Sequence, residues 1–468
     1  MAGAGVLTVE DVVRGTQGAL VSGDLGVRVT GVSIDSRALG VGQCFFAIRG
    51  YRLDGHAFLL DAAARGAACL VVHALPDDMP ASVAIVLVDD TTRALGRLGA
   101  YHRARFTLPV AAVTGSNGKT TTKEMMAAVL AALGPVLKPE SSFNNQWGLP
   151  LTLLQLTAEH RAAALEIGTN SPGEIAALAA IARPTVGVVT TIASVHTEFL
   201  GSLEGVAAEK GALVEALPRA GVAVLNADDP RVVALAGRSA ARVLTYSAAG
   251  DPTADVRAAA EPDDSGDGLA VALESRGERR TARLAFAGRH NAVNALAAAG
   301  VGLAIGLPLE TIVRGLEQAR PVKGRCVWRP AGRIRILDDT YNANPAALRA
   351  ALATLAAARG GTRRVVVLAD MLELGDLALE AHREAGRAIA AAGVAELVGV
   401  GRLAEEAVAA ARGAGLAEAH HAATFEDTVA ILLKRLAPGD LVLVKGSRGM
   451  RMERVVDALM ARYGAADG

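Results

Sequence analysis

Apolar runs of strand length alternate with alanine-rich segments of helical length after residue 107. A short apolar run bounded by turn residues predicts a strand that is buried on both faces, and the longer segments predict helices. Strands that alternate with helices predict a parallel sheet covered by helices on both sides. The predicted strands are 110–114, 162–167, 185–191 and 222–226.

A second series of the same kind begins near residue 333 and predicts a Rossmann-like domain. Segment 320–324, which contains a proline and a glycine, is the predicted joint before this domain. Between the two series, 248–277 is rich in Asp, Gly and Ala, and it predicts turns and edge strands at the rim of the central domain. The strands predicted for the second series are 333–337, 365–368, 397–400 and 441–444.

The first hundred residues predict a small α/β unit. Short β-like runs at 27–34 and 44–48 precede an alanine-rich helix that ends at 68–72, and 91–105 predicts a connecting helix. The predicted fold class is therefore α/β in three domains. These are a small α/β N-terminal domain at 1–106, a central P-loop ATPase domain with a parallel sheet at 107–320, and a C-terminal Rossmann-like domain at 321–468.

Composition supports several domains and excludes some partners. A chain of 468 residues is too long for one ordinary core. Basic and acidic residues both number 48, so the net charge of 0 provides no global field that attracts nucleic acid or an anionic membrane. Cys44, Cys69 and Cys326 are scattered without a metal-binding spacing and are predicted to be reduced structural thiols.

Two segments bear on the location of the chain. The N-terminus has no basic segment before its apolar residues, which does not fit a signal peptide and makes the cytoplasm the expected compartment. The uncharged stretch 291–309 is long enough to raise the question of a membrane span. Its asparagines, many alanines and glycines, and Pro308 instead predict a buried helix followed by a turn.

The strongest chemical signal is a glycine turn between a strand and a helix. Gly115 and Gly118 allow a tight turn whose N–H groups face a polyphosphate, Lys119 supplies a positive charge, and Thr120 can bind magnesium. The loop is a shortened variant, because Val113 occupies the position where the usual motif has its first glycine. The alternative is an ordinary glycine-rich turn, which the Lys and three Thr residues disfavour. The helix is predicted at 124–133.

Further polar candidates follow the central strands. Glu166 ends a predicted strand, at the sheet edge where ligands of open α/β folds gather, and it could bind Mg²⁺. A helix-capping or solvated glutamate is an equal alternative. His196 lies beyond the next strand, where a lone histidine is usually a hydrogen-bonded loop residue. Lys210 by itself indicates an exposed helical lysine.

Two more polar groups occur later in the chain. His290, Asn291 and Asn294 place a ring and two amides on one helix, where they could hold a purine. The alternative, helix capping by Asn291, does not explain Asn294. Segment 337–345 leaves a strand with two carboxylates, two amides and a proline. An Asx-turn with a helix cap would explain about two of those residues.

Together these motifs resemble the Mur ligases, ATP-dependent enzymes that form amide bonds in the peptidoglycan precursor. The resemblance spans nearly the whole chain and rests on the ordered set TGSNGKTTTKEM, LEIGTNSPGEI, VHTEFLGS, EKGALVEALP, GRHNAVNALAA, VKGR and DDTYNANP. Segments 143–150, 341–345 and 444–448 are most similar to the member that adds D-alanyl-D-alanine to UDP-N-acetylmuramoyl-tripeptide. The Tyr-Ala-His-x-Pro and Asp-Asn-Pro-Arg motifs of the ligase that adds the third residue are absent.

The resemblance also implies site residues and two Mg²⁺ ions. Thr120 and Glu166 would bind one ion, and His196 with a carbamylated Lys210 would bind the second. The implied catalytic residues are Lys119, Glu166, His196, Lys210 and Arg325. The implied ATP contacts are Thr114, Gly115, Ser116, Asn117, Gly118, Lys119, Thr120, Thr121, His290, Asn291, Asn294, Arg325 and Asp339. The implied substrate contacts are Ser36, Arg37, Phe46, Asp54 and His56 at the UDP end, with Asn144, Asn145, Tyr341, Asn342, Asn344 and Lys445 elsewhere.

One residue departs from the family pattern, and several alternatives stay open. Trp147 stands where related sequences often carry a smaller aliphatic residue, so its contact with substrate is uncertain. Another ligase of the superfamily, of the diaminopimelate-adding or folylpolyglutamate type, would differ in the amine that it uses. A nucleotide-dependent regulatory module would hydrolyse ATP without an amine, and a degenerate structural partner would have lost site residues. A monomer without a membrane span or a nucleic-acid partner is expected.

Overall fold

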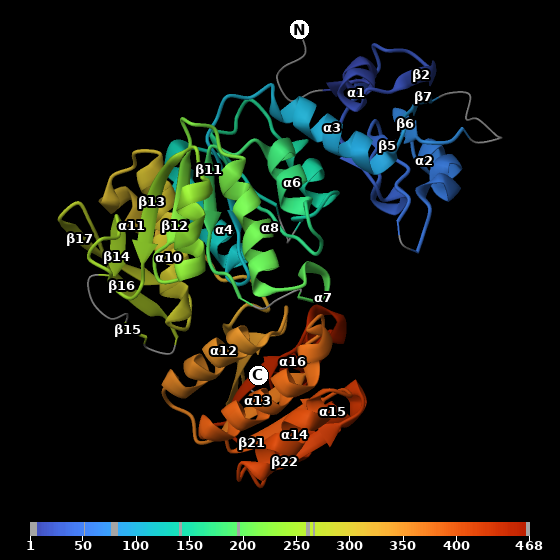
Figure 1. The fold of residues 1–468 in the computed structure, drawn as a ribbon. Coiled ribbons are helices and arrows are strands. Elements are labelled where there is room, and N and C mark those ends of the chain that lie inside the picture. Colours follow the sequence, from blue (N-terminus) through green and yellow to red (C-terminus); the bar gives the residue numbers. More distant parts are fainter. Residues whose placement is uncertain are drawn as a thin grey trace.

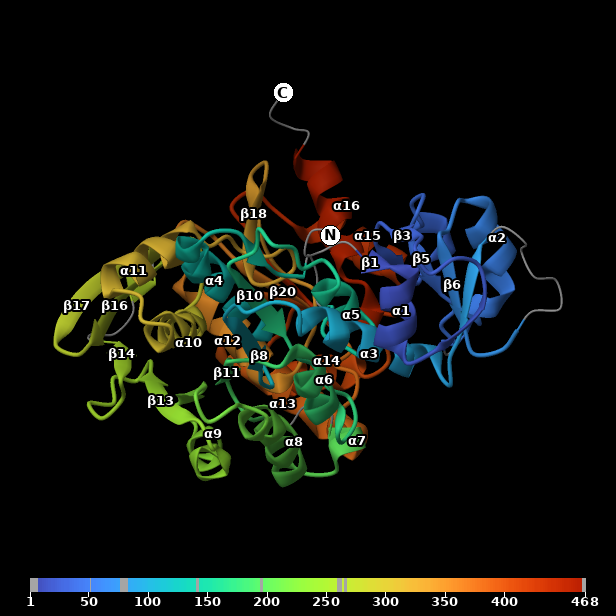
Figure 2. The ribbon, with the colours of Figure 1, turned by 90° about the horizontal axis from the view of Figure 1, so that it is seen from above.

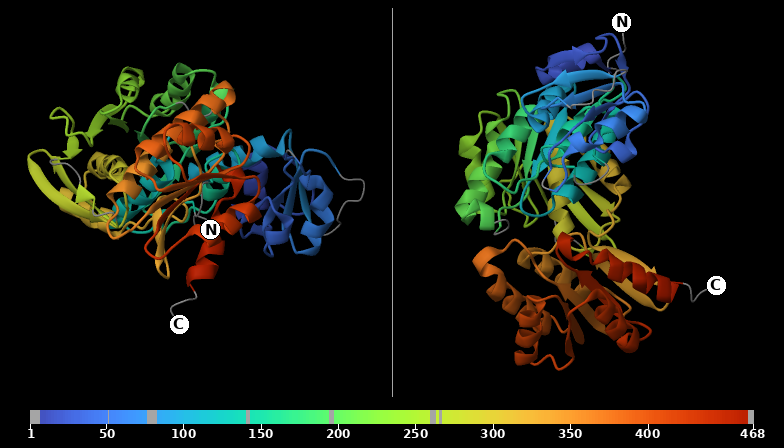
Figure 3. Two further views of the ribbon diagram at one scale, coloured as in Figure 1. Left: turned by 90° about the horizontal axis from the view of Figure 1, so that it is seen from below. Right: turned by 90° about the vertical axis from the view of Figure 1, so that its right-hand side faces the viewer.

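The chain forms three α/β bodies that follow one another along the sequence (Figure 1). The computed structural model describes residues 7–50, 52–75, 83–139, 143–193, 197–258, 263–264 and 267–464. Sheets of five, ten and six strands define the N-terminal, central and C-terminal bodies. The predicted fold class is confirmed, whereas the boundaries near residues 106 and 320 stay a prediction. Seen from above, the blue N-terminal body lies beside the central one (Figure 2), and the C-terminal body lies beneath it (Figure 3).

The central sheet is parallel through its middle and antiparallel at one rim. Its order is β15-β16-β14-β13-β12-β11-β8-β10-β9, with β17 paired to β16. The parallel strands are β8 (Val110–Thr114), β9 (Val136–Leu137), β10 (Ala162–Glu166), β11 (Val186–Val189), β12 (Val222–Asn226) and β13 (Arg242–Ser247), and β14 (Val256–Ala258) is parallel to β13. The antiparallel rim is formed by β15 (Asp263–Asp264), β16 (Leu269–Ser275) and β17 (Glu278–Leu284). The four predicted strands and the predicted rim at 248–277 are confirmed.

Helices cover both faces of this sheet because side chains alternate along each strand. Ala111 and Val113 face one layer, formed by α4 (Lys119–Leu130), α10 (His290–Ala304) and α11 (Leu309–Gln318). Val110 and Ala112 face the other layer. That layer contains α5 (Gly148–Leu153), α6 (Glu174–Ala182), α8 (Leu203–Glu215) and α9 (Pro230–Val233).

The uncharged stretch 291–309 is a buried helix and a turn, as predicted. Helix α10 carries eleven buried residues and packs against α4, α11 and the sheet. Its small side chains allow that close packing. None of the described helices is both long and apolar enough to cross a membrane.

The N-terminal sheet corrects two predictions. Its order is β2 (Ala19–Ser22), β7 (Ala84–Leu87), β6 (Cys69–Val72), β5 (Cys44–Phe46) and β4 (Val32–Ser33). The prediction that a helix ends at 68–72 is wrong, because helix α2 (Leu59–Ala64) ends earlier and the apolar Cys-Leu-Val-Val run is a fully buried strand. Run 27–34 forms two strands, β3 (Arg28–Val29) and β4. Strand β3 pairs with β1 (Leu7–Thr8), which directly precedes α1 (Val9–Thr16), and is not part of the five-stranded sheet. The three cysteines are free and buried, and burial raises the pKa of the Cys44 thiol.

The C-terminal sheet has the order β18-β19-β23-β20-β21-β22. Its strands are β18 (Val327–Ala331), β19 (Ile334–Asp339), β20 (Arg364–Ala369), β21 (Glu396–Val400), β22 (Ala419–Ala422) and β23 (Leu441–Lys445). The four predicted strands are confirmed. One face is covered by α12 (Pro345–Ala357), α13 (Ala378–Ala391) and α14 (Ala404–Gly413), and the other by α15 (Phe425–Arg435) and α16 (Glu453–Tyr463).

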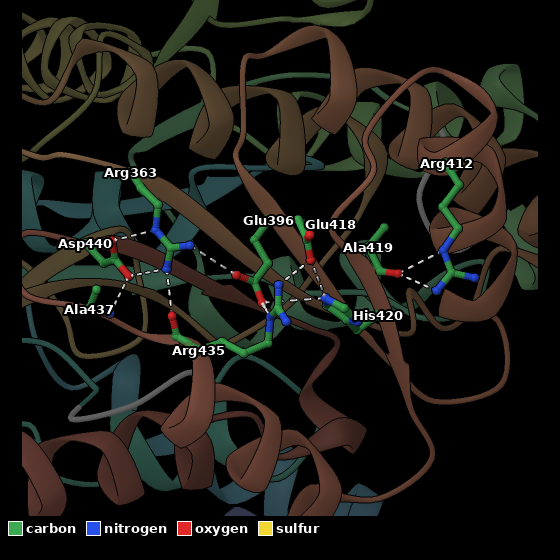
Figure 4. A network of polar contacts seen from close by, with 9 residues as sticks. All are labelled: Arg363, Glu396, Arg412, Glu418, Ala419, His420, Arg435, Ala437 and Asp440. Atoms are coloured by element: carbon green, nitrogen blue, oxygen red, sulfur yellow. Dashed lines mark hydrogen bonds and ion pairs between the residues drawn. The ribbon is translucent and has the colours of Figure 1, made fainter.

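A network of ion pairs crosses the amino ends of these strands (Figure 4). Arg363 donates two hydrogen bonds to Asp440, at 3.1 and 2.8 Å. Arg435 donates to Glu396 at 2.5 Å and also contacts Glu418. Glu396 is 1% exposed, whereas the side chain of Glu418 is 53% exposed. A buried carboxylate needs such partners, so the network maintains the edge of the sheet opposite to its carboxyl ends.

Glu396→Gln should lower the stability of the C-terminal body by about 2 kcal/mol, because two arginines lose the charge of a buried partner. The matched control Glu418→Gln removes an exposed partner of Arg435 and should cost less than about 1 kcal/mol. The thermal unfolding midpoint of the full chain checks both values. Equal midpoints for the two variants would contradict this difference.

Candidate active site

The predicted phosphate loop is a turn between β8 and α4. Gly118 has φ +81°, and an added Cβ there would collide with Oδ1 of Asn294. The loop is tied to the end of β11, since the backbone N–H of Ser116 donates to the carbonyl of Thr191 at 2.8 Å. Helix α4 begins at Lys119, five residues before the predicted start, because the Lys-Thr-Thr-Thr run is already helical. Thr114 is the buried last residue of β8, and Thr121 lines the adjacent cleft.

Thr120 and Glu166 meet at the carboxyl end of the sheet. The Thr120 hydroxyl donates to Oε2 of Glu166 at 2.8 Å, and Asn144 donates its amide N–H to Oε1 at 2.7 Å. Glu166 is 1% exposed, so the alternative of a solvated or helix-capping glutamate is wrong. A hydroxyl and a carboxylate in contact are hard oxygen ligands of the kind that Mg²⁺ prefers.

Positive charge is concentrated beside this pair. The Lys119 ammonium donates to the carbonyl of Gly115 at 2.8 Å, and Arg325 of the C-terminal body donates to the Thr120 hydroxyl at 2.7 Å. Desolvation lowers the pKa of Lys119. The negative charge of Glu166 opposes this shift, and the positive charge of Arg325 adds to it. A multiply charged anion would relieve this repulsion between cations.

Lys210 is buried, which corrects the reading of an exposed helical lysine. It is 2% exposed on α8, and its amine makes no hydrogen bond to any residue that the structure describes. Burial lowers its pKa to about 7; the nearby charge of Lys119 acts in the same direction and Glu209 opposes it. An uncharged amine at neutral pH can react with CO₂ to form a carbamate. His196 lies outside the described residues.

Sequence reasoning missed Glu209, the neighbour of Lys210. Its carboxylate accepts the backbone N–H groups of Gly173 at 2.7 Å and Ile175 at 2.8 Å. It therefore fixes the start of α6 and the loop that follows Glu166. No sequence pattern marks Glu209 as a buried residue, because a helical Glu-Lys pair is common on solvated surfaces.

The candidate purine site lies at the first turn of α10. Asn291 donates to the carbonyl of Ala287 at 2.7 Å and accepts from Asn294 at 2.8 Å. Asn294 in turn accepts from the Thr122 hydroxyl at 3.1 Å, so α10 is joined to the phosphate-loop helix. The helix-cap alternative for Asn291 is wrong, because α10 begins at His290 without a side-chain cap. His290 and Asn294 line the cleft, whereas Asn291 does not.

The C-terminal body contributes a second polar group. Lys445 is buried, pairs with Asp339 and donates to the carbonyl of Asn342 at 2.9 Å. Asn344 caps α12 and also donates to Oδ1 of Asn117 in the phosphate loop, at 2.8 Å. The Arg325 guanidinium lies 3.8 Å from the centre of the Tyr341 ring. The predicted cap is therefore present, and the remaining residues of 337–345 make contacts that capping does not explain.

The residues predicted at the UDP end lie in the N-terminal body. Arg37 is exposed, and its hydrogen bond lowers the pKa of Asp35 to about 2. Asp54 contacts Nδ1 of His56 at 2.8 Å, and the His73 backbone N–H donates to Nε2 of His56, so both ring nitrogens are occupied. Phe46 is fully buried in the core, which makes its side chain unavailable to a ligand. Ser36 is also buried.

One cleft of about 790 Å³ brings most of the predicted residues together. It lies between the phosphate loop of the central body and the carboxyl end of the C-terminal sheet. The predicted residues that line it are Ser116, Asn117, Gly118, Lys119, Thr121, Asn144, Asn145, Glu166, His290, Asn294, Arg325, Asp339, Tyr341, Asn342, Asn344 and Lys445. Thr120 lines a smaller adjoining cavity with Arg325 and Arg448. Sequence reasoning missed the lining residues Leu372, Glu373 and Leu374, which follow the carboxyl end of β20 and could have been found from that position.

Comparison with known proteins defines the class of this enzyme. The Mur ligase middle domain matches residues 113–302, the Mur ligase glutamate ligase domain matches 324–448, and the Mur ligase family catalytic domain matches 28–103. The chain belongs to the Mur ligase family, which confirms the predicted resemblance.

Within that family, several relatives at 32–39% identity share one name. UDP-N-acetylmuramoyl-tripeptide–D-alanyl-D-alanine ligase from Mycobacterium tuberculosis is 39% identical, with 93% of each chain covered. The Escherichia coli enzyme of the same name is 37% identical over 92% of this chain and 94% of that one. A MurF crystal structure from Acinetobacter baumannii has a TM-score of 0.89 at 32% identity, and covers 97% of this chain and 99% of that chain. MurF from Thermotoga maritima, solved with ADP, has a TM-score of 0.81 at 26% identity, over 93% and 98%.

Proposed function

We infer that the chain is an ATP-dependent ligase that joins D-alanyl-D-alanine to UDP-N-acetylmuramoyl-tripeptide in the synthesis of the peptidoglycan precursor. The observation that carries this inference is the cleft in which Lys119 and Glu166 face Arg325 and Asn344 of the C-terminal body. The names of the relatives at up to 39% identity support the substrate assignment.

We propose that ATP phosphorylates the terminal carboxylate of the tripeptide and that the dipeptide amine attacks the resulting acyl phosphate. Hydroxide is a poor leaving group, whereas phosphate leaves readily from the tetrahedral intermediate. The amine loses a proton as the C–N bond forms and the C–O bond to phosphate breaks. No enzyme nucleophile is required, so positioning and charge neutralisation carry the catalysis.

The residues of the cleft divide this work. Lys119 and Arg325 neutralise charge on the transferred phosphoryl group, and the N–H groups of 115–118 hold the neighbouring phosphates. His290 and Asn294 hold the adenine, and Asp339 contacts the ribose. Tyr341, Asn342 and Lys445 contact the substrate from the C-terminal side. The domains 1–106, 107–320 and 321–468 would bind the UDP end, bind ATP and complete the ligase site, respectively.

Thr120 and Glu166 fit one Mg²⁺, because their oxygen atoms already meet within 2.8 Å. We propose His196 and a carbamylated Lys210 for a second Mg²⁺. Carbamylation would convert the buried cation into an oxygen ligand and remove its repulsion with Lys119. Bound Mg²⁺ would neutralise negative charge on the phosphates of ATP. We also propose that the chain acts as a monomer in the cytoplasm.

The decisive experiment measures phosphate release from ATP with UDP-N-acetylmuramoyl-tripeptide and one added amine. D-alanyl-D-alanine, diaminopimelate, lysine and glutamate are compared, and mass spectrometry identifies the product. We expect amide formation with the dipeptide alone. Turnover with diaminopimelate or lysine on a UDP-N-acetylmuramoyl-dipeptide control would assign the chain to the preceding step, and amine-independent hydrolysis would support a regulatory nucleotide module.

A further inference from the structure

Helix α3 (Thr91–Arg103) connects the N-terminal and central bodies through two adjacent threonines at its start. The Thr91 hydroxyl donates to the carbonyl of Ala47, next to strand β5 of the N-terminal sheet, at 3.0 Å. The Thr92 hydroxyl accepts the indole N–H of Trp147, in the central body, at 3.0 Å. One helical turn therefore holds both bodies.

Trp147 belongs to a loop that also holds Glu166. Asn145 accepts the backbone N–H groups of Trp147 and Gly148, at 3.2 and 2.9 Å, which fixes the turn into α5. The preceding residue, Asn144, donates to Glu166 at 2.7 Å. Segment 144–148 therefore contacts the N-terminal body through Trp147 and the proposed magnesium ligand through Asn144.

The rest of α3 is fixed against the central body. Gly99 lies so close to Pro150 of α5 that an added Cβ would approach the proline Cβ to 2.9 Å. Near the end of the helix, buried Arg103 donates to the carbonyls of Ala182 at 3.0 Å and Phe106 at 2.7 Å. These contacts hold α3 against the central body, and the indole hydrogen bond adds a directional contact at the start of the helix.

We propose that Trp147 is a positioning residue that holds the N-terminal body on the loop beside Glu166 and so aligns the carboxylate of a bound UDP-linked substrate with ATP. The proposal rests on the proposed function. A substrate held at its UDP end reaches the cleft from a distance, so a small error in the angle between the bodies misplaces the reacting carboxylate. Misplacement of about 1 Å can cost on the order of 100-fold in rate.

The test compares Trp147→Phe with the parent enzyme on two acceptors. Phenylalanine retains an aromatic ring against the buried cluster of the N-terminal body but cannot donate to Thr92. We expect kcat with UDP-N-acetylmuramoyl-tripeptide to fall about 10-fold, with the KM for ATP unchanged within about twofold. With N-acetylmuramoyl-tripeptide, which lacks the UDP anchor, parent and variant should react equally slowly, because no remote binding energy is available to either.

Thr92→Val removes the acceptor of the same hydrogen bond and should lower kcat by a similar factor. The kcat of the double variant should be no lower than that of either single variant. Trp328→Phe, a substitution on β18 outside the cleft, should retain full activity. Full activity of Trp147→Phe on the UDP-linked acceptor, or an equal loss on both acceptors, would overturn the positioning role. A parent enzyme without dipeptide-dependent turnover would instead overturn the proposed function itself, and this role with it.

Discussion

Lys119→Ala should lower turnover by at least about 1,000-fold and leave the fold intact. The ammonium lies at the start of α4, 2.8 Å from the Gly115 carbonyl and beside Glu166 and Arg325. Its charge is worth more in this partly buried cleft than in water, because the lower local dielectric screens its attraction to the transferred phosphoryl group less. Phosphate release with all three substrates present measures the loss, and the thermal unfolding midpoint measures the fold.

Lys138→Ala is the matched control for this change. Lys138 follows strand β9, is half-exposed and contacts Glu124 of α4, and it does not line the cleft. Its removal should leave turnover within about twofold. A folded Lys119→Ala enzyme that retains parental activity would show that the glycine loop does not hold the reacting phosphates.

Lys210→Ala should lower turnover by roughly 100-fold or more, because it removes the proposed carbamate ligand. Acetate or propionate should restore part of the activity, since a small carboxylate can occupy the vacated space and supply an oxygen. The control Lys434→Ala removes a lysine from the last turn of α15 and should change nothing. Failure of every small carboxylate to rescue a folded Lys210→Ala enzyme would count against the carbamate.

The pKa of Lys210 also predicts the pH dependence of its modification. Only the uncharged amine adds CO₂, and burial lowers this pKa to about 7 from 10.5. The uncharged fraction therefore rises as pH increases through 7, and carbamylation at constant dissolved CO₂ should rise between pH 6 and 8 and then level off. Carbon-13 NMR with labelled CO₂ measures the carbamate directly. A signal first gained near pH 10 would show an ordinary lysine instead.

The sequence predicted the centre of each parallel sheet well and its margins poorly. Strands such as β8 and β12 are buried on both faces, so they form continuous apolar runs whose ends are visible. Edge strands β18 and β22 were missed because one contains Pro330 and the other two histidines. Helix α4 begins early because β-branched threonines, weak helix formers by themselves, are held in its first turn by the glycine loop.

The candidate site also contains residues that the sequence predicts and residues that it does not. Residues next to a strand end or a glycine turn, such as Lys119 and Glu166, were found from local pattern. The contact between Asn117 and Asn344 joins residues 227 positions apart, so no local pattern specifies it. The burial of Lys210 escaped prediction for a related reason: the elements that cover α8 are distant in the chain, and helical spacing by itself indicated a solvated lysine.

The position of β23 affects how this protein emerges from the ribosome. Strand β23 is the last strand of the described residues, yet it lies between β19 and β20 in the middle of its sheet. The N-terminal sheet has all its strands by residue 87 and can form early, whereas the C-terminal sheet stays divided until residue 445 has been synthesised. A premature stop codon anywhere before β23 would therefore remove the central strand together with Lys445, so translation must run almost to its end before any ligase site exists.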